Sequence, residues 1–379
     1  GINKIDPSKN QFLKFKPSLY SSQSRNNCWS FFENDSILFS GYDNGIQIHY
    51  KGTKKYEWVN VEGPVLDITE FEKKILIGTG KGVFALNYKD SCFALDSTKI
   101  DVSVKEKQDI IFKFFSFEGK LLIGSLNFLS VYNDSLELEN RWQIKNVRDF
   151  TVFNNQVFFT AYPTGLYALS KLTIPTQSTF TRIPLPEVEH LLGLSIAASE
   201  HHVWIGLYGG GLIQFDPSNS TTQHYSTKDG LPNNTIYGIV PYMNTLWLST
   251  NGGLSRLDLG KETFENFNTE DGIQSLEFNS GAKYINQEGQ IYMGGINGYN
   301  IINPKKENKN KIAPKVYISS IFYKGKDILT KESKYLTKIN GDDEVSIPHF
   351  RNNFIILIKL ICTFAVRVQT QNSYFWYFT

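Results

Sequence analysis

The sequence predicts an all-β fold: a seven-bladed β-propeller followed by part of a small β-sandwich. An apolar triplet recurs seven times at intervals of about 36 to 46 residues, which is the length of one propeller blade. A unit of this size cannot bury its own apolar face, so neighbouring units must stack to form a closed core. The triplets begin at Ile37, Ile75, Leu121, Val157, Val203, Leu246 and Ile291.

Each repeat contains the pattern of four strands. A glycine lies about seven or eight positions after the start of six of the triplets and joins two alternating runs, as a β-hairpin requires. An apolar run before the triplet, such as residues 65–68 or 147–150, supplies an inner strand, and a short run after the hairpin supplies an outer strand. Four strands in each of seven repeats predict the seven-bladed propeller.

The chain divides into three predicted parts: a propeller at residues 1–304, a charged linker at 305–314 and a partial β-sandwich at 315–379. The seventh repeat ends after its third strand, at Pro304. An N-terminal strand near residues 12–16 would complete that blade and cover its exposed edge. Alternatively, residues 1–16 would end a different propeller that lies upstream.

Composition excludes several classes of function. The chain has 39 basic and 37 acidic residues, and no lysine or arginine cluster follows the repeat, so a nucleic-acid groove is not expected. The six histidines lack metal-ligand spacing, and we predict neither a metal site nor a cofactor. Three cysteines that lie far apart predict no disulfide framework: Cys28, Cys92 and Cys362.

Two further features concern targeting and membranes. The sequence starts at Gly1 without a secretory apolar segment, which is typical of a processed chain or an expressed fragment. The longest apolar run, residues 354–366, contains Lys359 and is shorter than the roughly 20 residues that a membrane-spanning helix needs. We therefore interpret this run as core strands of the second domain.

Two local patterns imitate catalytic motifs. Residues 78–82, GTGKG, look like a phosphate loop but coincide with a predicted hairpin turn, and no helix follows them. Residues 193–197, GLSIA, resemble a nucleophile elbow but occupy an inner strand. We predict no catalytic residue, although two carboxylates could still meet across blades.

Several segments resemble one family of sensors. Residues 229–239, DGLPNNTIYGI, followed by residues 246–258, LWLSTNGGLSRLD, resemble the two-component-regulator propeller repeat. Residues 203–212 are a second good match, and residues 271–304 resemble the terminal propeller repeat of the same sensors. Residues 315–323 resemble the opening strand of the tyrosine-rich Ig-like domain that follows in that family.

The resemblance implies the periplasmic sensor region of a hybrid two-component histidine kinase of Bacteroidetes type, an ectodomain of an inner-membrane protein. Such proteins carry two propellers, and this chain matches the second propeller and the start of the Ig-like domain. From residue 353 onward the chain departs from the family pattern, which a truncated or out-of-frame end would explain.

For partners and activity, the resemblance implies an oligosaccharide ligand from polysaccharide breakdown, a homodimer, and signalling across the membrane to control transcription. The kinase parts would lie outside this chain, so this region would not be an enzyme. Two alternatives stay open. A protein-interaction scaffold would show an exposed apolar patch, and a propeller lyase or glycosidase would show two carboxylates roughly 5 to 9 Å apart.

The candidate ligand contacts lie in the turns between second and third strands, together with the loop into the first inner strand, because propellers commonly bind ligands there. Tyrosine rings can stack on a sugar, while asparagine, aspartate and arginine can bond its hydroxyls. Ordinary turn chemistry is the alternative explanation for the asparagines and aspartates. The predicted contacts are Arg25, Tyr42, Asp43, Asn44, Tyr162, Tyr208, Asn251 and Asn297.

Overall fold

A computed structural model describes most of the first 305 residues and three later strands. The described parts are residues 12–17, 26–89, 92–100, 109–162, 165–169, 180–185, 188 and 190–305, and the strands within 315–361. The chain separates into two units, Gly1–Asn308 and Lys309–Thr379, which we describe separately.

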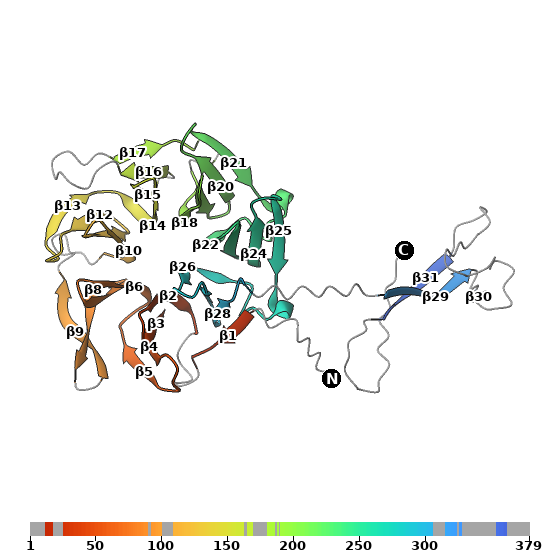
Figure 1. Cartoon of the computed structure of the whole chain (residues 1–379), viewed down its shortest axis with the longest axis horizontal. Helices are drawn as coiled ribbons and strands as arrows, with labels where there is room; N and C mark the ends of the chain where they lie inside the picture. Colours follow the sequence, from red (N-terminus) through yellow and green to blue (C-terminus); the bar gives the residue numbers. More distant parts are fainter. Residues whose placement is uncertain are drawn as a thin grey trace. The chain divides into compact units, whose positions relative to one another are not determined.

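The first unit is a ring of seven antiparallel four-stranded sheets (Figure 1), which confirms the all-β class and the seven-bladed propeller. The first three blades contain β2 (Cys28–Glu33), β3 (Ile37–Tyr42), β4 (Gly45–Tyr50) and β5 (Tyr56–Asn60); β6 (Val65–Phe71), β7 (Lys74–Thr79), β8 (Gly82–Lys89) and β9 (Cys92–Ile100); and β10 (Ile111–Phe117), β11 (Lys120–Ser125), β12 (Leu129–Tyr132) and β13 (Leu138–Trp142).

The remaining blades follow the same order, except that the outer strand of the seventh comes from the start of the chain. They contain β14 (Lys145–Phe153), β15 (Gln156–Tyr162), β16 (Gly165–Leu169) and β17 (Phe180–Ile183); β18 (Gly193–Ala198), β19 (Val203–Leu207), β20 (Gly211–Asp216) and β21 (Thr221–Tyr225); β22 (Ile236–Tyr242), β23 (Thr245–Thr250), β24 (Gly253–Asp258) and β25 (Thr263–Phe267); and β26 (Phe278–Ile285), β27 (Ile291–Gly295), β28 (Gly298–Ile302) and β1 (Phe12–Phe15).

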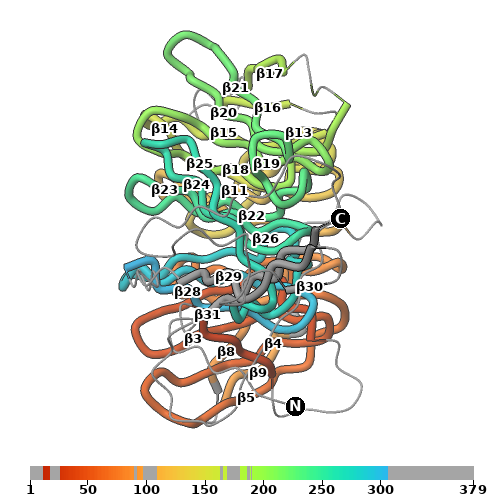
Figure 2. Tube along the Cα trace, turned by 90° about the vertical axis from the view of Figure 1, so that its right-hand side faces the viewer, coloured from red at the N-terminus to blue at the C-terminus, as the bar shows by residue number. Residues whose placement is uncertain are grey.

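The two ends of the propeller sequence meet in the seventh blade. Strand β1 pairs antiparallel with β28, with Phe12 opposite Ile302 and Phe15 opposite Tyr299. The Phe15 ring stacks on Tyr299 with a centroid distance of 5.3 Å. The first and last blades lie side by side (Figures 1 and 2), and Asn279 of β26 donates to the Cys28 carbonyl of β2 at 2.9 Å. The added strand covers an edge that would otherwise expose unpaired backbone groups.

The apolar triplets form the second strand of each blade, where both faces are covered by neighbouring blades. Their members are among the most buried side chains: Phe39, Leu76, Leu121, Trp204 and Trp247 are each at most 1% exposed. Burying an aliphatic or aromatic side chain of this size stabilises a fold by roughly 1.5–3 kcal/mol. The periodic triplets are therefore the main source of blade-to-blade packing.

Two short 3₁₀ helices explain why the DG dipeptide recurs in the later blades. They are η3 (Thr227–Asp229) and η4 (Thr269–Asp271), and each begins with a capping box in which the side chain of Ser226 or Asn268 bonds the first turn. The glycine after each aspartate has a positive φ, 113° at Gly230 and 100° at Gly272, which glycine adopts without strain.

The second unit contains a three-stranded antiparallel sheet with the order β30-β29-β31. Its strands are β29 (Lys315–Tyr323), β30 (Lys326–Asp327) and β31 (Phe354–Ile361). Strand β31 covers the start of the long apolar run, and the Ig-like assignment stays a prediction. Among the residues described, no helix has the length and apolar character to cross a membrane.

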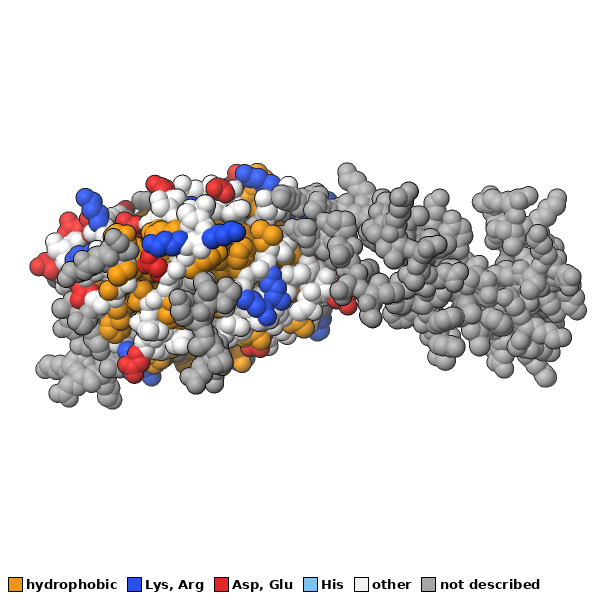
Figure 3. All heavy atoms as spheres, turned by 90° about the horizontal axis from the view of Figure 1, so that it is seen from below, with side chains coloured by type: hydrophobic (Ala, Val, Ile, Leu, Met, Phe, Trp, Pro, Cys, Tyr) orange, Lys and Arg blue, Asp and Glu red, His pale blue; other side chains and the backbone are white. Residues whose placement is uncertain are grey.

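Charged side chains do not gather on the side of the propeller that Figure 3 shows. Basic and acidic groups are scattered over the described surface, with apolar side chains between them. This distribution agrees with the nearly equal numbers of basic and acidic residues in the chain.

Candidate functional site

All seven inner strands carry an irregularity in register at the same place. In five of them one residue is skipped, as between Val65 and Asp67 or between Ile111 and Lys113, and in β14 and β26 the skip is longer. A bulge adds an unpaired residue and changes the direction of the next side chain. The residues that resume pairing, which we call the axial ring, are Ser30, Asp67, Lys113, Asp149, Ser195, Gly238 and Lys283.

Several side chains of the axial ring bond the backbone of the next inner strand along the chain. Asp67 Oδ2 accepts from the Phe114 amide at 2.7 Å, and Asp149 Oδ2 accepts from the Ile196 amide at 2.9 Å. The Ser195 hydroxyl accepts from the Ile239 amide at 3.2 Å in the same way. These bonds satisfy backbone donors of the neighbouring inner strand, which would be costly to bury alone.

Two buried ion pairs complete the ring. Lys113 Nζ lies 2.8 Å from Asp67 Oδ1, between the second and third blades. Lys283 Nζ of the seventh blade lies 2.7 Å from Asp149 Oδ2 of the fourth blade and donates to the Ser195 hydroxyl of the fifth at 2.7 Å. Lys283 therefore joins three inner strands around the axis of the propeller, and the four charges sum to zero.

Burial and ion pairing act in opposite directions on the pKa values of Asp67, Lys113 and Lys283. Desolvation raises the pKa of Asp67 and lowers the pKa of Lys283. Desolvation also acts to lower the pKa of Lys113, but the carboxylates of Asp67 and Asp149 outweigh it and raise that pKa. Both carboxylates accept from a lysine and from backbone amides, which is the bonding pattern of structural carboxylates.

A second set of side chains comes from the bulges themselves and approaches the turns between second and third strands. Trp29 Nε1 donates to Asp43 Oδ1 at 2.6 Å, and the Asn27 amide donates to Asp43 Oδ2 at 3.0 Å. Tyr237 occupies the corresponding bulge of the sixth blade, and burial raises the pKa of its hydroxyl, with smaller contributions from Glu277 and Tyr208. We call this side of the propeller the turn face.

The fourth blade contributes a cation to the same set. The Arg148 Cζ lies 3.6 Å from the centroid of the Phe112 ring, which occupies the corresponding bulge of the third blade. Such stacking is a cation–π contact. Aromatic, polar and cationic side chains thus occur together on one face, the combination from which saccharide-binding surfaces are built.

The structure places several predicted contacts on the turn face. Tyr162 and Tyr208 are 45% and 59% exposed, and Asn44 and Asn251 are exposed as well. Asp43 is partly buried, where Trp29 and Asn27 hold its carboxylate. Of these residues, Asp43 contacts an inner-strand aromatic side chain, that of Trp29.

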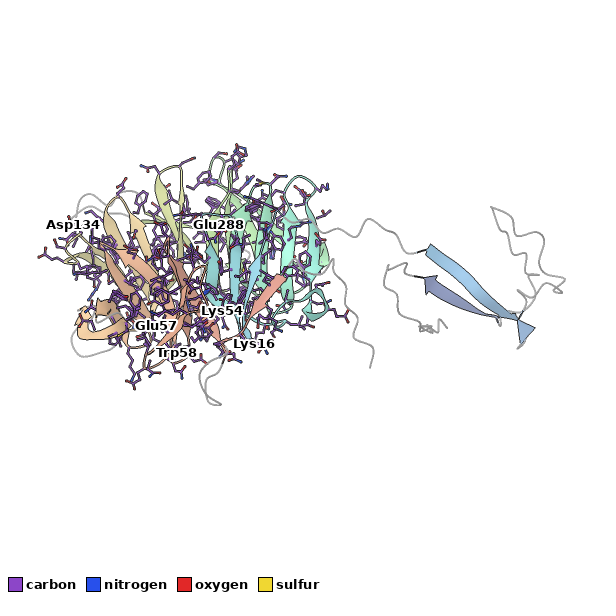
Figure 4. All side chains as sticks on the ribbon, turned by 60° about the horizontal axis from the view of Figure 1, so that its bottom comes forward. Lys16, Lys54, Glu57, Trp58, Asp134 and Glu288 are labelled. Atoms are coloured by element: carbon purple, nitrogen blue, oxygen red, sulfur yellow. The ribbon has the colours of Figure 1, made fainter. Side chains whose placement is uncertain are left out.

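Two predicted contacts have a different environment, and a third is not among the described residues. Tyr42 is fully buried, and Trp58 of the outer strand β5 (Figure 4) lies over it at a centroid distance of 5.7 Å, so the ring belongs to the core of the first blade. Asn297 is held by Gln274, whose carbonyl accepts from its side chain at 3.1 Å. Arg25 lies outside the described residues.

The sequence analysis missed the residues that give this face its chemistry, chiefly Trp29, Phe112, Arg148 and Tyr237. One signal was available: a charged or small residue interrupts each inner run at the same position, as Asp67 and Asp149 do. The bulge that exposes the preceding residue is a backbone feature without a residue signature, so spacing alone could not locate it.

Two pockets lie on the opposite face, among turns between first and second strands. One of about 690 Å³ is lined by residues of the fourth and fifth blades that include Asn154, His201 and Asp216. The other, of about 160 Å³, lies between the seventh and first blades and includes Glu33 and Glu288. Within the described part of the chain, no group of three or more His, Cys, Asp or Glu side chains could hold a metal ion.

Comparison with solved structures supports the fold. The extracellular domain attributed to the hybrid two-component system BT3049 of B. thetaiotaomicron matches 92% of this chain with a TM-score of 0.71 and 21% identity, over 48% of its own length. A second such domain, from BT4673 of the same organism, matches 91% of this chain with a TM-score of 0.61 and 15% identity, over 50% of its length.

The propeller of the WD40 protein Doa1 matches 79% of this chain and 99% of its own with a TM-score of 0.56 and 11% identity. No protein-family model and no curated protein sequence matches the chain. The chain spans about half the length of the two bacterial domains. At these identities the likeness establishes the fold. The BT3049 and BT4673 domains are extracellular regions attributed to two-component systems, the class of protein that the sequence resemblance indicates.

Proposed function

We propose that this chain is the ligand-sensing part of an extracytoplasmic sensor domain in a hybrid two-component system, and that its ligand is an oligosaccharide. The observation that carries the proposal is the turn face, where Trp29 is fixed against Asp43 and the ring of Tyr208 is exposed in the turn between β19 and β20. Flat aromatic surfaces beside fixed polar groups suit sugar rings, which present apolar faces and a hydroxyl rim.

The fold supports the same proposal. Two structural neighbours are extracellular domains attributed to a hybrid two-component system, and the one from BT3049 matches nearly the whole chain. A periplasmic location, a homodimer and an upstream propeller are parts of the proposal that come from the sequence resemblance. A ligand would signal through a difference in affinity between two arrangements of the subunits or domains.

The direct test is a calorimetric screen of defined oligosaccharides against the complete ectodomain. A specific ligand should also raise the unfolding midpoint in proportion to its concentration, because it binds the folded state alone. Tyr208→Ala should weaken binding at least about tenfold, equivalent to about 1.4 kcal/mol. Tyr88→Ala is the matched control, since Tyr88 is 60% exposed and lies on β8 far from a strand 2–3 turn.

Two outcomes would contradict the proposal. If no oligosaccharide binds the complete ectodomain, the saccharide-sensing function is wrong. If a bound oligosaccharide is cleaved, the region is an enzyme, and product analysis by mass spectrometry in the same screen detects this. If the wild type and Tyr208→Ala bind the oligosaccharide equally well, Tyr208 does not contact the ligand, and the assignment of the site to this part of the turn face is wrong.

A further inference from the structure

Arg148 is a largely buried cation for which the described residues supply no acidic partner. Its Nη2 donates to the Asn146 side-chain carbonyl at 3.1 Å, and its buried Nε has no hydrogen-bond partner. Within the described part of the chain, no carboxylate forms an ion pair with it. The adjacent Asp149 is already bound to Lys283. A largely buried guanidinium without a counter-charge is costly to a fold, which points to a second role for this side chain.

The position of the side chain is fixed by its neighbours. The guanidinium lies over Phe112 with Cζ 3.6 Å from the ring centroid, and the Asn146 amide holds one of its terminal nitrogens. A guanidinium that stacks on a ring keeps its N–H donors in its own plane, where they can bind two oxygens of one anion. Burial lowers the pKa of Arg148 to about 10, which leaves it charged at neutral pH.

The charges around it do not compensate for this cation. In the axial ring, Lys113 pairs with Asp67 and Lys283 pairs with Asp149, so the ring is neutral and Arg148 adds a net positive charge. A comparison within the chain is Arg256, which also lies near an aromatic ring, that of Trp247, but is paired with Glu265. Of these two arginines, Arg256 has an acidic partner, whereas Arg148 stacks on a ring without one in the described part of the chain.

We propose that Arg148 binds an anionic group of the ligand, so that the sensor recognises an acidic saccharide bearing a carboxylate or a sulfate. This inference rests on the proposed function and adds the chemical class of the ligand. The anion would receive two N–H donors from the exposed edge of the guanidinium, and aromatic side chains of the turn face would contact the sugar ring.

The test measures affinities of matched saccharides with the complete ectodomain by calorimetry. One set contrasts an oligouronate with its methyl ester, and another contrasts a sulfated oligosaccharide with its desulfated form, so the two sources of anion are distinguished. The variant Arg148→Met keeps the apolar stem and removes the charge. Arg148→Lys keeps the charge but loses the planar fork, and Arg256→Met is the control.

We expect an acidic member to bind at least about tenfold more tightly than its neutral partner, and Arg148→Met to weaken it about 10- to 100-fold. Arg148→Lys should lose part of that affinity, and Arg256→Met none of it. Affinity of the wild type should also fall as salt rises, a readout that remains valid if Arg148→Met fails to fold.

Distinct results separate the two proposals. Equal binding of acidic and neutral partners, or salt-independent binding, overturns the anion inference and leaves the sensor function intact. Wild-type affinity of folded Arg148→Met for the acidic member also overturns it. If neither acidic nor neutral saccharides bind, the proposed function and this inference both fail.

Discussion

Replacing Lys283 by methionine tests whether the axial ring holds the propeller together. Lys283 Nζ donates to Asp149 Oδ2 and the Ser195 hydroxyl, both at 2.7 Å, and to the Ile196 carbonyl at 3.0 Å. The substitution keeps a stem of similar length and removes only the ammonium group. The Asp149 side chain, which is 2% exposed, would then keep its bonds from Ser195 and backbone amides but lose its counter-charge.

Leaving one member of a buried pair alone typically costs about 3–5 kcal/mol. For a domain of this size, each kcal/mol lowers the unfolding midpoint by about 2–4 °C, so we expect a decrease of about 6–20 °C. Urea unfolding followed by tryptophan fluorescence gives the free energy directly. Asp149→Asn should be similarly destabilising, and the double variant should cost less than the sum of the two single variants.

Lys261→Met is the matched control, because that side chain is 74% exposed and lies 3.5 Å from Asp258. It should leave the unfolding midpoint unchanged. A loss of less than about 1 kcal/mol in Lys283→Met would refute the structural role of the ion pair. Single-variant costs that add to within about 0.5 kcal/mol in the double variant would show that the two groups are not coupled.

Three further predictions concern closure, thiol chemistry and pH. Gly298→Ala should destabilise far more than Gly52→Ala in thermal unfolding, because both have positive φ but only the new Cβ at 298 would meet the Phe15 carbonyl, at 2.0 Å. Iodoacetamide and peptide mass mapping should modify exposed Cys92 before Cys28, whose thiol pKa is raised by burial; equal rates would contradict this. Because the Asp67 pKa is raised above 3.8 in the folded state, the contribution of Asp67 to the unfolding free energy should fall as pH rises just above 3.8. The unfolding free energy of the wild type minus that of Asp67→Asn should therefore decrease with pH in this range, and a difference that does not change with pH would exclude this role of Asp67.

The number and order of the blades could be predicted because both depend on local periodicity. The triplets, the turn glycines and the DG dipeptides each have a local physical cause: burial of the second strand, a positive φ, or a capped 3₁₀ turn. Strand pairing of β1 with β28 joins distant residues, yet the missing fourth strand of the seventh repeat pointed to it. Each repeat needs the triplet and the turn residues for its own folding, so these features recur along the chain and can be recognised in one sequence.

The chemistry of the turn face was less predictable. Lys283 and Asp149 are 134 positions apart, so no local pattern relates them. Tyr42 illustrates the opposite error: a turn position indicated exposure, whereas Trp58 of another strand covers the ring. Arg148 was read as part of an inner strand, and its separate role depends on a bulge that appears only in the pairing of β14 with β15.

The axial ring also bears on how such a propeller could transmit a signal. Lys283 connects inner strands of the fourth, fifth and seventh blades, so widening the ring there would separate a buried ion pair and several hydrogen bonds. That cost exceeds the 1–3 kcal/mol typical of coupling between sites. Under the proposed function, ligand binding on the turn face is therefore better coupled to the arrangement of whole domains or subunits than to opening of the blades, because a rigid ring can transmit a change in position without deforming.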